Sequence, residues 1–257
     1  LNYIMQNYYF DRDAGLDIKK ATEMTGKKVK QNIKNFLEIF DSNEDLISNF
    51  SKYILQDYLK CISNGSKEVL MIIPVGPVGQ YQILSKLIIR EGISLDNLTL
   101  IVMDEYLDEN MNYISQKDPL SFRGHIKRNF LDQLPKNLRP TIIVPNPKKV
   151  NNVSKIIKDK GGVDYCYAGV GITGHLAFNE PEEYLNDPNK YKNTVTRVVN
   201  LSKETRLMNS LTTSQGNINR IPHFAVTIGM SEILNSRRIR VFMNRVWQWS
   251  VLRKLLF

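Results

Sequence analysis

Short apolar runs alternate along this chain with longer segments in which apolar residues recur every three or four positions. The runs predict buried strands at 69–74, 98–103, 141–145, 163–170, 195–199, 224–228 and 238–243. The helical spacing covers residues 17–40, 44–61, 81–91, 122–133 and 150–160. Strands that alternate with helices predict an α/β fold with a mostly parallel, open sheet and helices on both faces, which is a doubly wound, Rossmann-like arrangement.

The longest polar stretches, 182–193 and 212–219, are expected to form loops or a flap over a site. No internal repeat or low-complexity linker divides the sequence. We therefore expect one domain over residues 1–257.

Composition places the chain among ordinary globular proteins. It has 257 residues, 42% of them hydrophobic, and a mean hydropathy of −0.31. No apolar run approaches the roughly 18–20 residues that span a bilayer, and the first residues lack the apolar core of a signal peptide. Cys61 and Cys166 fit buried thiols of a reducing compartment and form no metal motif. A cytoplasmic protein without membrane contact is expected.

The formal charge of +9 raises the question of nucleic-acid binding. The basic residues are spread along the chain, with a modest cluster at Arg237, Arg238, Arg240 and Arg245. No recognition motif or aromatic-basic interleaving accompanies them. A solvated basic surface that attracts a small anionic ligand explains the charge better than a nucleic-acid partner does.

A glycine-spaced turn with a histidine and a carboxylate follows the apolar run 163–170, in the string GVGITGHLAFNEP at 169–181. His175 lies just beyond the carboxyl end of the predicted strand, where open α/β sheets place their ligands. Glu180 is close enough in sequence to fold back onto the imidazole and fix its tautomer. Taken alone, a histidine near a turn is more often an ordinary hydrogen-bonded polar residue.

Two further groups stand at predicted strand ends. Asp104 and Glu105 follow the run 98–103, and because adjacent residues of an extended segment point in opposite directions, only one can face a given pocket. A turn or helix-cap carboxylate is the simpler reading. Gly76 and Gly79 lie between a strand and a helix, where free N–H groups can hold a phosphate, although such turns are as often mere tight connections.

The strings MDEYLD at 103–108 and GVGITGHLAFNEP at 169–181 resemble those of the glucosamine-6-phosphate deaminase family. Similarity extends through 121–134, 203–210 and 221–234, so that it spans roughly residues 69–252. The Asn-Glu-Pro ending and the MDEY block differ from the related 6-phosphogluconolactonases.

The resemblance implies a catalytic set. Asp104 would move a proton between the first two sugar carbons, His175 would open the sugar ring, and Glu180 would orient His175. The implied reaction converts glucosamine 6-phosphate or a close amino sugar phosphate into fructose 6-phosphate and ammonia, and it needs no metal or redox cofactor. A sugar phosphate is then the small-molecule partner, and a homo-oligomer is expected because the family often assembles into oligomers.

The chain departs from the family where substrate is recognised. Thr173 replaces the Asp that usually stands two residues before the histidine, and a threonine supplies no negative charge. Leu211 replaces an Arg, and the Lys expected near Val246 or Trp247 is absent.

The phosphate contacts are therefore expected to be rearranged. In the loop 75–81, Val75, Pro77 and Val78 stand in place of hydroxyl donors. Arg206 and Arg245 are the nearest remaining cations and are either phosphate ligands or surface arginines. The predicted substrate-binding set comprises Gly76, Gly79, Glu105, Thr173, Gly174, Arg206 and Arg245.

Two alternatives to the deaminase stay open at this point. One is a related sugar-phosphate isomerase or lactonase with another substrate, and the other is a protein that binds a sugar phosphate without turnover, a reading favoured by Thr173 and Leu211. Family members usually continue into another strand and helix. This leaves open whether the single domain lacks a C-terminal segment.

Overall fold

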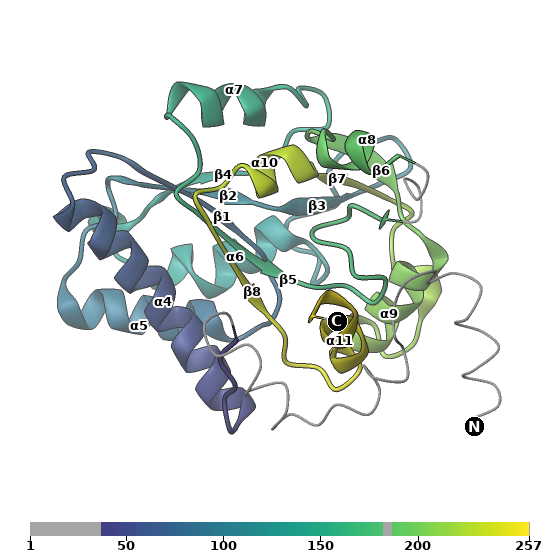
Figure 1. The fold of residues 1–257 in the computed structure, drawn as a ribbon, viewed down its shortest axis with the longest axis horizontal. Helices are drawn as coiled ribbons and strands as arrows, with labels where there is room; N and C mark the ends of the chain where they lie inside the picture. Colours follow the sequence, from purple (N-terminus) through teal and green to yellow (C-terminus); the bar gives the residue numbers. More distant parts are fainter. Residues whose placement is uncertain (1–36, 182–186, 257) are drawn as a thin grey trace. The chain divides into compact units, whose positions relative to one another are not determined.

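A computed structural model describes residues 37–181 and 187–256 of the protein (Figure 1). The chain divides into two compact units, residues 42–244 and residues 1–41 with 245–257. The second unit contains the helix α11 (Gln248–Leu256). All the strands and the remaining helices of the described residues belong to the first unit. The prediction of one domain over the whole chain stays a prediction.

A parallel five-stranded sheet runs through the larger unit. Each neighbouring pair of its strands is parallel, and the strand order is β4-β2-β1-β5-β8. Its strands are β1 (Val69–Ile73), β2 (Leu98–Val102), β4 (Thr141–Ile143), β5 (Tyr165–Gly169) and β8 (Arg238–Phe242). The first two strands are buried along their whole length, as expected for a parallel sheet that is covered on both faces.

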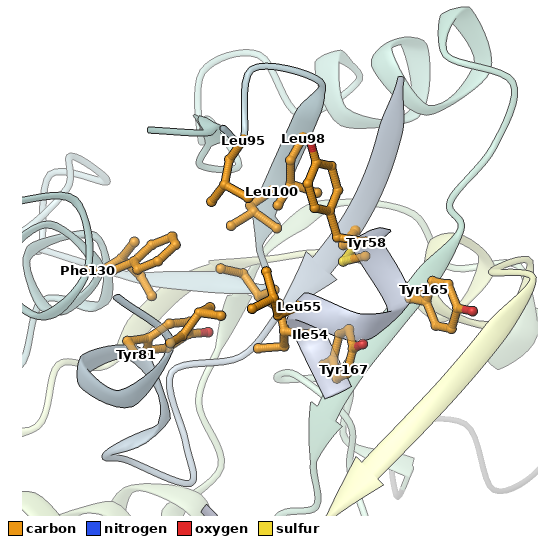
Figure 2. Packing of buried hydrophobic residues seen from close by; sticks show 14 of the residues in the cluster. Ile54, Leu55, Tyr58, Tyr81, Leu95, Leu98, Leu100, Phe130, Tyr165 and Tyr167 are labelled. Carbon is orange, nitrogen blue, oxygen red and sulfur yellow. The ribbon is translucent and has the colours of Figure 1, made fainter. Parts of the chain in front are cut away.

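Alternate residues of these strands enter two separate hydrophobic clusters. In β1, Met71 lies in one cluster with Tyr81 and Phe130, while its neighbour Ile72 lies in the other. Figure 2 shows the first cluster, in which tyrosines of β5 and residues of the helix α4 (Asn43–Ser63) share one face of the sheet. The two-residue period of a strand therefore divides the core into two layers.

Helices cover both faces (Figure 1). The first cluster receives side chains from three helices, and the second receives Val153 and Ile233 from two others. This confirms the predicted α/β, doubly wound arrangement. The helices of the first face are α4 (Asn43–Ser63), α5 (Gln80–Glu91) and α6 (Phe122–Asn129), and those of the second are α7 (Asn152–Asp159) and α10 (Met230–Leu234).

A second, antiparallel sheet was not predicted. It has the order β3-β7-β6 and consists of β3 (Asp104–Leu107), β7 (Phe224–Thr227) and β6 (Arg197–Asn200). The apolar pattern located β6 and β7 but assigned them to the parallel sheet, and it gave no strand at β3. The two-residue period of a strand predicts which side chains lie on the same face. It does not predict which other strand will pair with it.

Several boundaries also differ from prediction. The helix expected over 122–133 ends at Asn129 and is followed by a 3₁₀ turn at Leu131–Gln133. The polar helix α9 (Lys203–Thr213) was not predicted, and the short helix α8 (Pro188–Lys192) occupies part of the expected loop 182–193. Of the helix expected over residues 17–40, the part up to residue 36 lies outside the described residues. Residues 37–40 are irregular.

Two further 3₁₀ turns of the described residues are Lys136–Leu138 and Ile218–Arg220. No helix among the described residues is long and apolar enough to cross a membrane.

Candidate active site

The loop that carries His175 begins where β5 ends, at Gly169. Within it, the Gly171 N–H donates to the His175 carbonyl at 2.9 Å, and the Gly174 N–H donates to the Gly171 carbonyl at 3.0 Å. Gly174 has a φ of 89°, in the left-handed region that favours glycine. A Cβ on Gly171 would overlap the imidazole of His175. The glycine spacing therefore forms a tight turn against which the imidazole lies.

His175 and Glu180 are in contact, as their spacing predicted. The imidazole Nδ1 is 3.3 Å from Glu180 Oε1, and both side chains are buried. Thr173 lies between them: its Oγ1 is 2.8 Å from His175 Nδ1 and donates to Glu180 Oε2 at 2.6 Å. The three side chains form one hydrogen-bonded group.

Helix α9 supplies two more donors to Glu180. The hydroxyl of Ser202, the N-cap of the helix, donates to Glu180 Oε1 at 2.9 Å, and that of Thr205 donates to the same oxygen at 2.5 Å. Burial alone would raise the pKa of Glu180, but the hydrogen bond and charge of His175, with bonds from Thr173 and Thr205, outweigh burial and hold the pKa at about 2. Glu180 is therefore a fixed anion beneath the imidazole.

Asn179 connects the His175 loop to neighbouring segments through hydrogen bonds. Its Nδ2 donates to the carbonyls of Leu176 and Ile228, each at 3.0 Å, and its Oδ1 accepts from Arg197 Nη1 of β6 at 2.7 Å. The neighbouring Phe178 N–H donates to Thr227 Oγ1 at 3.1 Å. Sequence reasoning missed Arg197 and Thr227, because nothing in the chain's local pattern links them to a loop so far away in sequence.

Asp104 is the first residue of β3 and lies opposite Thr227 of β7. Tyr106 projects from the same face of β3 as Asp104 and packs against Phe178, with ring centroids 5.8 Å apart. The Asp104 face of β3 is thus turned toward the His175 loop. Burial, and to a lesser degree the neighbouring charge of Glu105, raises the pKa of Asp104 to about 8.

Glu105 points the other way, as strand alternation predicts. Its fully buried carboxylate accepts from the Ser121 hydroxyl at 2.8 Å and from the backbone N–H groups of Phe122 and Arg123 at 3.0 and 2.9 Å. It therefore binds the amino end of helix α6, where an anion is favoured. Both oxygens of the carboxylate have protein donors, and the substrate contact of Glu105 stays a prediction.

The loop after β1 lies beside the start of the His175 loop. The Gly76 carbonyl oxygen would be 3.3 Å from a Cβ on Gly169, so two loops at adjacent strand ends approach closely. Gly79 has a φ of 112° and caps α5 without a side-chain hydrogen bond, and the first turn of α5 carries no acidic residue. The substrate contacts of Gly76 and Gly79 stay predictions that this geometry permits.

The cations expected to bind a phosphate are placed differently. Arg206 Nη2 donates to the carbonyls of Ile218 and Ile221 at 3.3 and 3.2 Å, which ties α9 to the turn after it. Leu211 is 61% exposed on the same helix. Arg245 belongs to the other compact unit, and its substrate contact stays a prediction. Arg206 thus has a structural role in this unit, and its contact with a phosphate stays a prediction.

Within residues 37–181 and 187–256, no group of three or more His, Cys, Asp or Glu side chains is placed to hold a metal ion. The site is built from one imidazole, two carboxyl groups of opposite pKa shift, and hydroxyl donors. Such a set can bind polar ligands and move protons.

Comparison with known proteins agrees with the resemblance. No protein-family model matches the chain. The glucosamine-6-phosphate deaminase of Borrelia garinii is 29% identical over 208 residues, which cover 78% of this chain and 73% of that protein. The deaminase of Caenorhabditis elegans is 26% identical over 213 residues, covering 80% of this chain and 75% of the relative.

Solved structures give the same result for the fold. A structure described as a monomeric glucosamine-6-phosphate deaminase matches with a TM-score of 0.67 and 25% identity, over 83% of each chain. The 6-phosphogluconolactonase of Thermotoga maritima matches with a TM-score of 0.59 and 14% identity, over 82% of this chain and 85% of that one. At that identity the lactonase likeness concerns the fold alone.

The α/β fold is one that the chain shares with a glucosamine-6-phosphate deaminase and with 6-phosphogluconolactonases. Within that class, the chain is a divergent relative of the glucosamine-6-phosphate deaminases.

Proposed function

We propose that this protein isomerises and deaminates glucosamine 6-phosphate or a close amino sugar phosphate, giving fructose 6-phosphate and ammonia. The proposal is supported by a buried imidazole held by an ionised Glu180, and by Asp104, whose pKa is about 8, on the strand β3 whose Tyr106 packs against Phe178 of the His175 loop. The relatives named for this reaction support the choice of substrate.

In this proposal the residues take the roles that the resemblance implies. His175 exchanges the proton that opens the sugar ring, and Glu180 holds the imidazole in place. Asp104, with a pKa near neutrality, takes a proton from carbon two and returns it to carbon one. Water then adds to the resulting imine, and ammonia leaves, so that one water is consumed for each ammonia released. No redox change occurs in this sequence of steps.

The test is the formation of ammonia and fructose 6-phosphate from glucosamine 6-phosphate by the purified protein. Asp104→Asn and His175→Ala are expected to abolish both products. Asp96→Asn and His223→Ala are matched controls, because both residues are exposed and lie outside the site, and these variants should keep wild-type rates.

Equal product formation by wild type and Asp104→Asn would reject the proposal. Hydrolysis of 6-phosphogluconolactone without ammonia would replace it with a lactonase. Thermal stabilisation by glucosamine 6-phosphate without any product would replace it with a binding protein, since a ligand that binds only the folded state raises apparent stability. The homo-oligomer and the cytoplasmic location stay predictions, to be checked by sedimentation and by localisation of the tagged protein.

A further inference from the structure

Thr173 occupies the position between the imidazole and the carboxylate of the site. Its Oγ1 lies 2.8 Å from His175 Nδ1 and 2.6 Å from Glu180 Oε2. By sequence, this threonine stands where the resemblance leads one to expect an aspartate. The structure therefore raises the question of what a neutral hydroxyl does there.

The hydrogen bonds of Thr173 fix where its proton goes. A threonine hydroxyl has one proton to donate, and an ionised carboxylate can only accept. The pKa of about 2 keeps Glu180 ionised at neutral pH, so the Thr173 proton is directed to Glu180 Oε2. The contact with His175 must then run the other way, with Nδ1–H as donor and the Thr173 oxygen as acceptor.

The contacts of Thr205 also indicate that Nδ1 of His175 carries the proton. Its hydroxyl donates to Glu180 Oε1 at 2.5 Å, and its oxygen lies 3.5 Å from His175 Nδ1. The third atom near Nδ1 is Glu180 Oε1 itself, at 3.3 Å, which is also an acceptor. Among the described residues, the three groups near Nδ1 thus all accept a proton from it. The shortest of the three contacts is the one to Thr173.

We propose that Thr173 is a positioning residue that fixes His175 with its proton on Nδ1 and leaves Nε2 as the atom that exchanges protons with the ligand. The Thr173 hydroxyl links the imidazole to the ionised Glu180 by hydrogen bonds and is itself uncharged. The assignment of Nε2 as the reacting nitrogen rests on the proposed function. The tautomer itself is a property of the protein without substrate and can be observed there.

The surroundings of Glu180 explain why a hydroxyl suits this position. Thr173, Ser202 and Thr205 all donate to its two oxygens. A carboxylate at position 173 would meet Glu180 Oε2 at hydrogen-bond distance, and two like charges that close cannot both stay ionised. In this chain a single buried anion with three hydroxyl donors orients the imidazole.

The experiment observes the tautomer directly, with ¹⁵N-labelled histidine and long-range ¹H–¹⁵N correlation spectra of the neutral imidazole in the substrate-free protein. His175→Ala identifies the signals of His175 among the three histidines. We expect a single Nδ1–H tautomer in the wild type and in Thr173→Ser, which keeps the hydroxyl. Thr173→Val keeps the shape but loses the hydroxyl, and it should show exchange between the two tautomers.

Two results would overturn the inference. The first is an Nε2–H tautomer in the wild type, and the second is an unchanged Nδ1–H tautomer in Thr173→Val, which would assign the orienting role to Glu180 or Thr205 alone. If Thr173→Val does not fold, as judged by thermal unfolding, Thr173→Ala is compared with Thr173→Ser in the same spectra.

The kinetic readout separates this inference from the proposed function. With glucosamine 6-phosphate, Thr173→Val should lower kcat by about 10- to 100-fold with little change in KM, the loss expected for one hydrogen bond within a charged group. Thr173→Ser should restore most of the rate. An Nδ1–H tautomer in a protein that releases no ammonia would refute the proposed function and leave the role of Thr173 standing.

Discussion

Replacing Asp104 by Asn should stabilise the protein at neutral pH while it abolishes the proposed activity. Asp104 is 8% exposed, and burial with the nearby charge of Glu105 raises its pKa to about 8. Between its unfolded value near 4 and this folded value, the native state binds a proton that the unfolded chain has lost. The native state is therefore disfavoured progressively as the pH rises through this range.

One pH unit within the range changes the free energy of unfolding by about 1.4 kcal/mol for one proton. From about pH 5 to pH 7, the folded protein keeps almost all of the Asp104 proton while the unfolded chain has lost it. The wild type should therefore lose ~3 kcal/mol relative to Asp104→Asn over these two units. An isosteric amide has no such titration.

The assay is urea unfolding of the wild type and Asp104→Asn at the two pH values, with Asp96→Asn as the exposed control. Other titrating groups are common to all three proteins and cancel in the differences. The difference in free energy of unfolding between the wild type and Asp104→Asn should change between the two pH values. A change of less than ~1 kcal/mol would refute the reasoning, because Asp104 would then ionise as an exposed carboxyl does. The control measures the change in stability that an Asp-to-Asn substitution at an exposed position produces at the two pH values.

Two further predictions concern the histidine loop. Because Glu180 has a folded pKa of about 2, below its unfolded value, it stabilises the protein above about pH 4.5 and loses this effect as the pH falls. The stability gap between the wild type and Glu180→Gln should shrink by ~2 kcal/mol from about pH 6 to pH 3 in urea unfolding, and a constant gap would contradict this. Gly171→Ala would push the His175 ring aside. We expect kcat/KM for ammonia release to fall about 100-fold, whereas an unchanged kcat/KM would show that the ring need not lie against this glycine.

Much of the fold was determined by local pattern. The two-residue alternation in β1 divides Met71 and Ile72 between two core clusters, which is why both faces of the sheet had to be covered by helices. The short separation of His175 and Glu180 was enough to predict their contact, since a tight glycine turn leaves few ways to place them.

Other local signals were misleading or silent. The spacing continued the helix of residues 122–133 through Phe130, where the backbone leaves the helical region with φ −132° and ψ −68°. The helix α9 has a polar sequence that carries little periodic signal, yet its Ser202 and Thr205 bind Glu180.

The sequence by itself determined which segments form the strands of the parallel sheet, that both faces of these strands are covered, and the pair of His175 and Glu180, because each of these depends on residues a few positions apart. Only the tertiary structure decided that β3 joins an antiparallel sheet, that Glu105 binds α6, and that Arg206 is held by backbone carbonyls. These contacts join segments distant in the chain. Their partners are selected by the packing of the whole unit, which no local pattern of apolar and polar residues records.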